Sequence, residues 1–190
     1  MTDRRSFIGA SAALAATAAA RPTLAAVAGR PRLYKAVVDA RFPESLAFAR
    51  EAARAGLPLA RIKGDVTDIW FNDLGPRWKT EPAAVVGMTG ADALFCLERL
   101  GWDAGLRVVF RAEHAAGADG AVEHRLSLAA VDRGALAGLQ GEDWPQQAAR
   151  LAMACRFAPA RQAFAVPGAC AAPAGPAQLV TWVIAPVQRA

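Results

Sequence analysis

Hydrophobic residues in the first half of the chain recur in a pattern that predicts strands alternating with helices. Short apolar segments predict four buried strands, at residues 33–40, 59–63, 83–88 and 106–112. Apolar residues at helical spacing predict helices between them, over 43–55, from Asp65 to a stop at Gly75 and Pro76, and from a cap at Thr89 to about residue 100. Three successive βα units with apolar strands favour a parallel sheet that is covered by helices.

The pattern changes after residue 114. A turn-rich connection over 115–121 leads to alternating apolar and polar residues over 122–128, as in a strand with one solvated face that pairs antiparallel with the fourth strand. A helix over 145–155, an irregular stretch over 156–177 and a β-prone strand over 178–185 follow. The predicted architecture is a three-layer α/β fold. It has about four βα-type strands in a mostly parallel sheet and an antiparallel C-terminal extension.

The N-terminal residues follow the three-part plan of a secretory signal. Arg4 and Arg5 precede an uncharged, alanine-rich run over 7–20, and small residues over 26–28 supply a cleavage site. The run is shorter than the about 20 apolar residues that span a bilayer. The adjacent arginines, with Phe7 two residues later, resemble the twin-arginine export signal. The segment departs from that consensus at positions 3, 8 and 9.

This resemblance implies export of a folded protein by the twin-arginine route. Residues 1–28 would be the signal peptide, and residues 29–190 a single periplasmic α/β domain that meets the membrane only during export. The formal net charge of +5 falls to +3 without the signal, and the remaining basic residues are scattered among acids. No nucleic-acid partner is therefore predicted.

The predicted strand ends place several chemically active side chains at one edge of the sheet. In an open parallel sheet, ligands bind outside the carboxyl ends of the strands, where the strand order reverses. An imidazole and carboxylates there are candidates for acid–base catalysis. These are His114, Glu113, Asp39 and Asp65. A guanidinium and a glycine-rich helix start are candidates for binding a phosphate or carboxylate. These are Arg41, Gly87, Thr89 and Gly90.

Simpler explanations exist for several of these residues. Helix capping explains Asp65 and Thr89, and a tight strand-to-helix turn explains residues 87–90. His124 is expected to lie half-buried on the apolar side of its strand. Three cysteines, at 96, 155 and 170, allow three disulfide pairings in an oxidising periplasm, and the spacing does not choose among them.

No ligand set for haem, an iron–sulfur cluster or a metal is evident in the sequence, so neither a cofactor nor a metal site is predicted. Proteins use the twin-arginine route chiefly because they must fold before export. Our first hypothesis is an accessory or ligand-binding protein, with an exported redox enzyme as its partner or a small anion as its ligand. The alternative is a small enzyme with an acid–base site at the strand ends. A structural protein that simply folds fast is a third interpretation.

Overall fold

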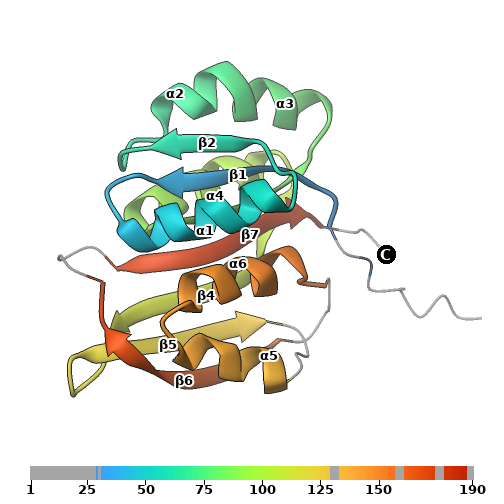
Figure 1. The fold of residues 1–190 in the computed structure, drawn as a ribbon. Coiled ribbons are helices and arrows are strands. Elements are labelled where there is room, and N and C mark those ends of the chain that lie inside the picture. Colours follow the sequence, from blue (N-terminus) through green and yellow to red (C-terminus); the bar gives the residue numbers. More distant parts are fainter. Residues whose placement is uncertain (1–28, 30, 129–132, 157–160, 174–177, 188–190) are drawn as a thin grey trace, which may run out of the picture.

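The computed structural model describes residues 29, 31–128, 133–156, 161–173 and 178–187. The predicted signal peptide, residues 1–28, lies outside the described residues. Strands from both halves of the chain form one sheet: β1 (Leu33–Asp39), β2 (Leu59–Ile62), β3 (Ala84–Gly90), β4 (Leu106–Ala116), β5 (Ala121–Leu128), β6 (Gln162–Ala171) and β7 (Leu179–Pro186). Their order in space is β2-β1-β3-β7-β4-β5-β6 (Figure 1).

Helices lie on both faces of this sheet. They are α1 (Pro43–Arg54), α2 (Thr67–Ile69), the π-helical turn η1 (Trp70–Leu74), α3 (Gly75–Thr80), α4 (Ala91–Asp103), α5 (Arg133–Ala137), the 3-10 turn η2 (Gly138–Gln140) and α6 (Trp144–Met153). In the part of the chain that the structure describes, no helix is long and apolar enough to cross a membrane. The α/β class predicted from the sequence is confirmed.

The finer prediction of a mostly parallel sheet of about four strands is not confirmed, because the sheet is mixed. Only β1 with β2 and β1 with β3 pair in parallel. The other pairings, β3 with β7, β7 with β4, β4 with β5 and β5 with β6, are antiparallel. The physical reason is the position of β7, which lies between β3 and β4 and separates strands that the βα pattern had suggested as neighbours.

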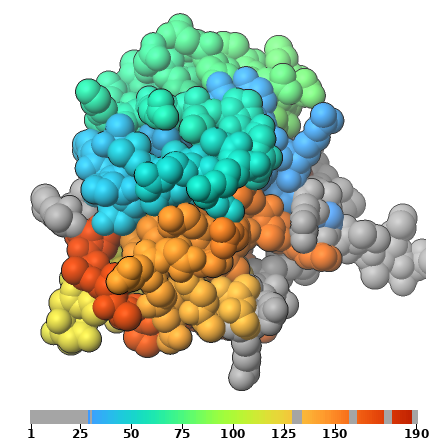
Figure 2. Space-filling model, viewed as in Figure 1, coloured from blue at the N-terminus to red at the C-terminus, as the bar shows by residue number. Residues whose placement is uncertain are grey.

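Two hydrophobic cores fill the space between the sheet and its helices. On one face, α1 contacts α6, and Phe48 and Trp144 from these helices join a core with Val86 of β3 and Leu126 of β5. Figure 2 views the molecule from this side, where atoms of the helices cover the sheet. On the other face, a second core contains side chains of η1, α3 and α4, among them Trp78, packed against β1, β3, β7 and the start of β4.

The helix predicted from Asp65 does not stop at Gly75 and Pro76. It begins at Thr67, passes through η1 and continues as α3 to Thr80. In the π turn, the amide of Gly75 donates to the carbonyl of Trp70, five residues back, so the lack of an N–H on Pro76 falls where the helix changes its hydrogen-bond pattern. A Cβ on Gly75 would lie 2.7 Å from that carbonyl oxygen, which explains why glycine occupies the turn.

The stretch over 156–177, predicted to be irregular, contains β6 within its described part. This strand pairs with β5 alone and so lies at the edge of the sheet. Its alanine, glycine and proline content lowers its intrinsic strand preference, and Pro167 is tolerated because an edge strand has one row of backbone groups without ladder partners. Pairing with β5 imposes the strand that local composition does not predict.

The three cysteines are free in the structure. Cys155 is buried, and burial raises the pKa of its thiol to about 12. Cys170 packs against the same core, whereas Cys96 is exposed on α4. None of the pairings left open by the sequence is formed here.

Replacement of Gly87 by alanine should destabilise the fold. Gly87 lies within β3, and a Cβ there would come within 2.4 Å of the indole ring of Trp182 and 2.6 Å of the carbonyl oxygen of Val37. Overpacking of this kind costs about 1–3 kcal/mol. Gly101 of α4 is the matched control, because a Cβ there meets its neighbours at 3.4 Å or more. Gly101→Ala should leave stability unchanged or raise it by up to about 1 kcal/mol. Urea unfolding measures both, and equal effects would contradict the packing argument.

Candidate functional site

The strand order reverses between β1 and β3. From β1 the chain goes to β2 on one side and then crosses to β3 on the other. Such a reversal leaves a crevice outside the carboxyl ends of the two strands, and this is the usual ligand position in open α/β sheets. Asp39 ends β1, Gly90 ends β3, and α4 begins directly after Gly90.

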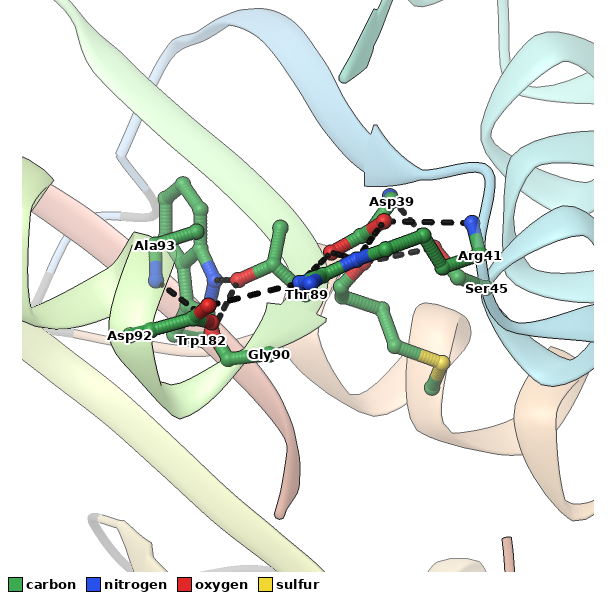
Figure 3. A network of polar contacts seen from close by, with 9 residues as sticks. Asp39, Arg41, Ser45, Thr89, Gly90, Asp92, Ala93 and Trp182 are labelled. Carbon is green, nitrogen blue, oxygen red and sulfur yellow. Dashed lines mark hydrogen bonds and ion pairs between the residues drawn. The ribbon is translucent and has the colours of Figure 1, made fainter. Parts of the chain in front are cut away.

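Asp39 is the buried anchor of this edge. Its side chain is 0% exposed and accepts hydrogen bonds from Arg41, at 3.0 Å from Nε to Oδ1 and 2.7 Å from Nη2 to Oδ2. Its backbone amide donates to Ser45 Oγ at 2.8 Å, and Ser45 donates in turn to the carbonyl of Met88 at 2.6 Å (Figure 3). The chain of hydrogen bonds joins β1, α1 and β3, so the carboxylate has a fixed position.

Arg41 extends from this anchor towards α4. Its side chain is 39% exposed, and Nη2 also lies 3.4 Å from Oδ2 of Asp92. The hydrogen bond to Asp39 is the main cause that raises the pKa of Arg41 above its usual value. Among the described residues, Nη1 has no hydrogen-bond partner. The guanidinium is therefore held on one side and open on the other.

Two glycines make room for the guanidinium. A Cβ on Gly64, whose φ is +87°, would lie 2.6 Å from Cζ of Arg41. A Cβ on Gly90 would lie 2.3 Å from Oδ1 of Asp92 and 3.1 Å from Nη2 of Arg41. The positive φ of Gly64 favours glycine at that position, and the absence of a Cβ at both glycines lets the Arg41 head group lie close to the backbone.

The two other predicted ligand-binding residues lie below this crevice. The hydroxyl of Thr89 is buried, accepts from Nε1 of Trp182 at 3.0 Å and donates to the carbonyl of Gly90 at 3.0 Å. It supports the turn but does not face solvent. Gly87 lies further inside the sheet, under the Trp182 ring. Gly90, not Thr89, occupies the capping position of α4, so the predicted cap was one residue early.

The candidate acid–base residues are not brought together. Asp39 is paired with Arg41, and Asp65 is exposed. Asp65 accepts from the backbone amide of Thr67 at 2.8 Å, and hydrogen bonds from the side chain and backbone of Thr67 lower its pKa. Glu113 pairs with Arg111 at 2.9 Å, and His114, as its sequence neighbour in β4, points to the opposite face.

His114 instead forms a buried pair with His124, which is its register partner on β5. The two Nδ1 atoms are 2.7 Å apart, and Nε2 of His114 lies 2.8 Å from the hydroxyl of Thr181. Both rings are essentially buried and both contact the Trp144 ring, with centroids 4.5 and 4.9 Å away. One Nδ1 must donate to the other, so the ring that accepts is neutral and carries its proton on Nε2.

Burial sets the protonation state of this pair. It holds the pKa of His114 well below 6.5, and the adjacent His124 lowers it further. Burial also lowers the pKa of His124 to about 4, against an opposing interaction with the Leu139 carbonyl. That carbonyl is not in normal hydrogen-bond geometry, since Nε2 of His124 has no partner among the described residues. A pair of neutral, enclosed imidazoles is a structural element, not an acid–base catalyst that reaches solvent.

A surface hollow lies at the other end of the sheet, beside Tyr34, Arg77 and Pro82. Tyr34 pairs there with Asp73 at 2.8 Å and Arg77 with Glu81 at 3.1 Å, whereas the buried Nε of Arg77 has no hydrogen-bond partner among the described residues. It adjoins the amino ends of β1 and β3. We place the candidate site at the strand-order reversal, because the open guanidinium and the start of α4 converge there.

The sequence did not single out three residues that build the site: Ser45, Asp92 and Trp182. Asp92 could have been identified from the sequence, because a carboxylate in the first turn of a helix interacts favourably with the positive end of the helix dipole. Ser45 and Trp182 depend on long-range packing and carry no local signal. Within the described part of the chain, no three His, Cys, Asp or Glu side chains are grouped so as to hold a metal ion.

Comparison with known proteins finds no relative of this chain. No known protein family, curated protein or solved structure matches this chain. What the site can do is therefore argued from its own geometry.

The buried histidine pair should make stability depend on pH below neutrality. In the unfolded chain both imidazoles bind a proton below about pH 6.5, whereas in the folded chain both stay neutral. Because the unfolded state then binds more protons, stability is full above about pH 6.5 and falls as the pH drops towards 4. A pKa of about 4 for His124 corresponds to a loss of roughly 3 kcal/mol from this residue.

NMR can follow the protonation of this pair directly, because His114 and His124 are the only two histidines in the chain. Urea unfolding at each pH measures the change in stability. Neither set of ring resonances should titrate between pH 6 and 8. The variant His114→Phe/His124→Leu, in which carboxylate titration is retained, should lose less stability than the wild type between pH 6.5 and 4. A ring that titrates with a midpoint near 6.5 would contradict the buried, neutral pair.

Proposed function

We propose that this protein is an exported, periplasmic ligand-binding module that takes a small anion at the carboxyl ends of β1 and β3. One observation carries the proposal. The guanidinium of Arg41 is fixed by a buried carboxylate at the strand-order reversal, yet its side chain is 39% exposed and lies beside Gly64 and Gly90.

The chemistry of the crevice favours a phosphate or carboxylate. Arginine offers planar, paired donors that match both groups, and Nη1 of Arg41 is free to donate among the described residues. The first turn of α4 adds backbone amides and the positive end of a helix of 13 residues. A ligand can approach the backbone closely at Gly64 and Gly90, because glycine has no Cβ to stand in its way.

Asp92 already occupies the position that a ligand carboxylate would take. Its Oδ1 accepts from the amide of Ala93 at 2.8 Å, and its Oδ2 lies 3.4 Å from Nη2 of Arg41. The side chain is 58% exposed, so it can turn into solvent when an anion arrives. The carboxylate of Asp92 thus shows which donors are available and competes for them.

The acid–base alternative is less well supported by the positions of its residues. His114 is enclosed with both ring nitrogens paired, Glu113 lies on the other face of β4, and Asp65 belongs to an exposed turn. A general acid or base must lie within hydrogen-bond reach of the reacting group. These side chains do not share such a position.

The proposal also includes a protein partner. Twin-arginine export of a chain without an evident cofactor set suggests that it accompanies an exported redox enzyme or delivers a ligand to one. The argument for this partner is the export signal alone.

Anion binding by the full chain tests the proposed site. Isothermal titration with inorganic phosphate and with succinate separates a phosphate ligand from a dicarboxylate. Arg41→Gln should weaken binding of the preferred anion about 10- to 100-fold, the worth of a charge-assisted pair of hydrogen bonds. Asp92→Asn should strengthen it severalfold, because a competing charge is removed. Arg54→Gln, exposed on α1, is the control and should change nothing.

Two outcomes of this titration are decisive. Because Arg41→Gln leaves the buried Asp39 carboxylate without its partner, the variant Asp39→Asn/Arg41→Gln removes both charges and preserves the fold. Unchanged affinity in both variants would exclude this crevice as the anion site. Binding that is lost equally in Arg54→Gln would indicate only a general effect of net charge.

Cell fractionation tests the proposed export. The full chain with Arg4→Lys/Arg5→Lys should accumulate in the cytoplasm, because lysine preserves the charge but not the arginine pair on which the route depends. Arg21→Lys changes a basic residue outside the pair and should leave the periplasmic fraction unaltered. Equal export of the wild type and the paired variant would contradict the twin-arginine assignment.

A further inference from the structure

The two edge strands of the sheet differ in how they are protected against pairing with another chain. The edge strand β2 is four residues long, contains the exposed Arg61 and is followed by the exposed Lys63. The other edge strand, β6, is ten residues long and has no charged side chain. In the described part of the chain it pairs with β5 alone (Figure 1). Short length and charge are common ways in which proteins prevent sheet edges from associating, so β6 is the less protected edge.

The hydrogen bonds between β4 and β5 show which residues of β5 bond to β6. The amide of Gly117 donates to the carbonyl of Ala121 at 2.7 Å, and this pair continues the register in which β4 meets β5. Residues of a strand bond alternately to its two neighbours, so Ala121 and every second residue after it bond to β4. The residues between them, which include Leu126, therefore bond to β6.

The same alternation shows which backbone groups of β6 have no partner in the sheet. Phe164 is the register partner of Leu126, so its backbone bonds to β5. The N–H and C=O groups of Ala163 and Ala165 therefore point away from the sheet. Pro167 comes next in this outward row, where its lack of an N–H costs no bond to β5. Ala163 and Ala165 thus offer their donors and acceptors to another extended strand.

The outward row is complementary to itself. If two β6 strands pair antiparallel about a twofold axis at Phe164, Ala163 of each copy lies opposite Ala165 of the other. These residues then exchange both hydrogen bonds, so every donor and acceptor that they offer is used. An axis at Ala165 would instead place Ala163 opposite Pro167, which has no N–H to donate. The half-buried Phe164 side chains meet at the first axis, and the exposed alanines on the other face of the strand are too small to hold the copies apart.

We propose that two copies of this chain pair edge to edge through β6, so that one sheet runs through both. An unpaired edge requires an extended strand, and a second copy supplies one whose outward row has the same length and the matching direction. The interface is isologous, as closed twofold pairs require. The proposal is independent of the anion site, because β6 contributes no residue to the crevice around Arg41.

Charged substitutions at the two alanines test the pairing by sedimentation velocity of the full chain over a concentration series. The wild type should form dimers as the concentration rises. Ala163→Lys/Ala165→Lys and Ala163→Glu/Ala165→Glu should each remain monomeric, because like charges then lie opposite one another. An equimolar mixture of the two should form a heterodimer. Ala53→Lys/Ala55→Lys, at exposed positions near the end of α1, is the matched control for the basic variant and should dimerise like the wild type.

A proline variant tests the backbone contribution. The N–H of Ala165 points away from β5, so Ala165→Pro should leave the monomer folded and abolish the dimer. A wild type that stays monomeric at the highest concentration excludes the pairing. A wild-type dimer that Ala165→Pro and both charged variants retain excludes this edge, and charged variants that stay monomeric when mixed exclude the register. Circular dichroism checks that each variant is folded, and Ala165→Pro decides the question if a charged variant is not.

Discussion

The backbone hydrogen bonds of β7 hold the two halves of the sheet together, since this strand lies between β3 and β4 and pairs antiparallel with both. Its residues from Leu179 to Ala185 are buried, because each face of the strand meets one of the two cores. Without β7, the parallel strands and the antiparallel strands would be two separate sheets, each with an unpaired edge. Both polar centres of the molecule also depend on this strand.

Adjacent residues of β7 support the two polar centres of the molecule. Thr181 points to one face, where its hydroxyl contacts His114, and Trp182 points to the other, where its indole donates to Thr89. Thr89 donates to the carbonyl of Gly90, next to the crevice that holds Arg41. The candidate site is therefore built by β1, α1, β3 and β7 together, although only β1 and β3 end at it. The histidine pair fastens β5 to β4 and β7 by a neutral contact that burial keeps uncharged.

Most elements of the fold could be predicted from the sequence because their signals are local. Pro43 at a helix start, apolar strands and the alternation from Val122 to Leu128 all report the conformation of their own segment. The strand β6 was not predicted from the sequence, because its pairing with β5, and not its composition, makes it a strand. The prediction that the helix stops at Gly75 was wrong, because a π turn accommodates Pro76 and the helix continues. The position of β7 could not be deduced, since strand order depends on contacts between distant segments.

The candidate site likewise has residues that the sequence predicts and contacts that it does not. Asp39 and Gly90 lie at strand ends and Arg41 lies just after one, so the βα pattern predicts that they converge. The inward direction of Thr89 depends on the Trp182 ring, and the contact of His114 with His124 depends on the register of β4 against β5. Neither is encoded near the residue concerned. Hydrophobic alternation placed His124 on the apolar side of its strand, but it could not name the ring that it meets there.

The central position of β7 has a consequence for the time course of folding. In the order of synthesis, β3 and β4 emerge well before β7, so the edges that it will join stay open until the later strand arrives. Long-range pairing of this kind is slow, and open edges invite pairing with other chains in the interval. A newly made chain is thus most vulnerable just before its sheet closes.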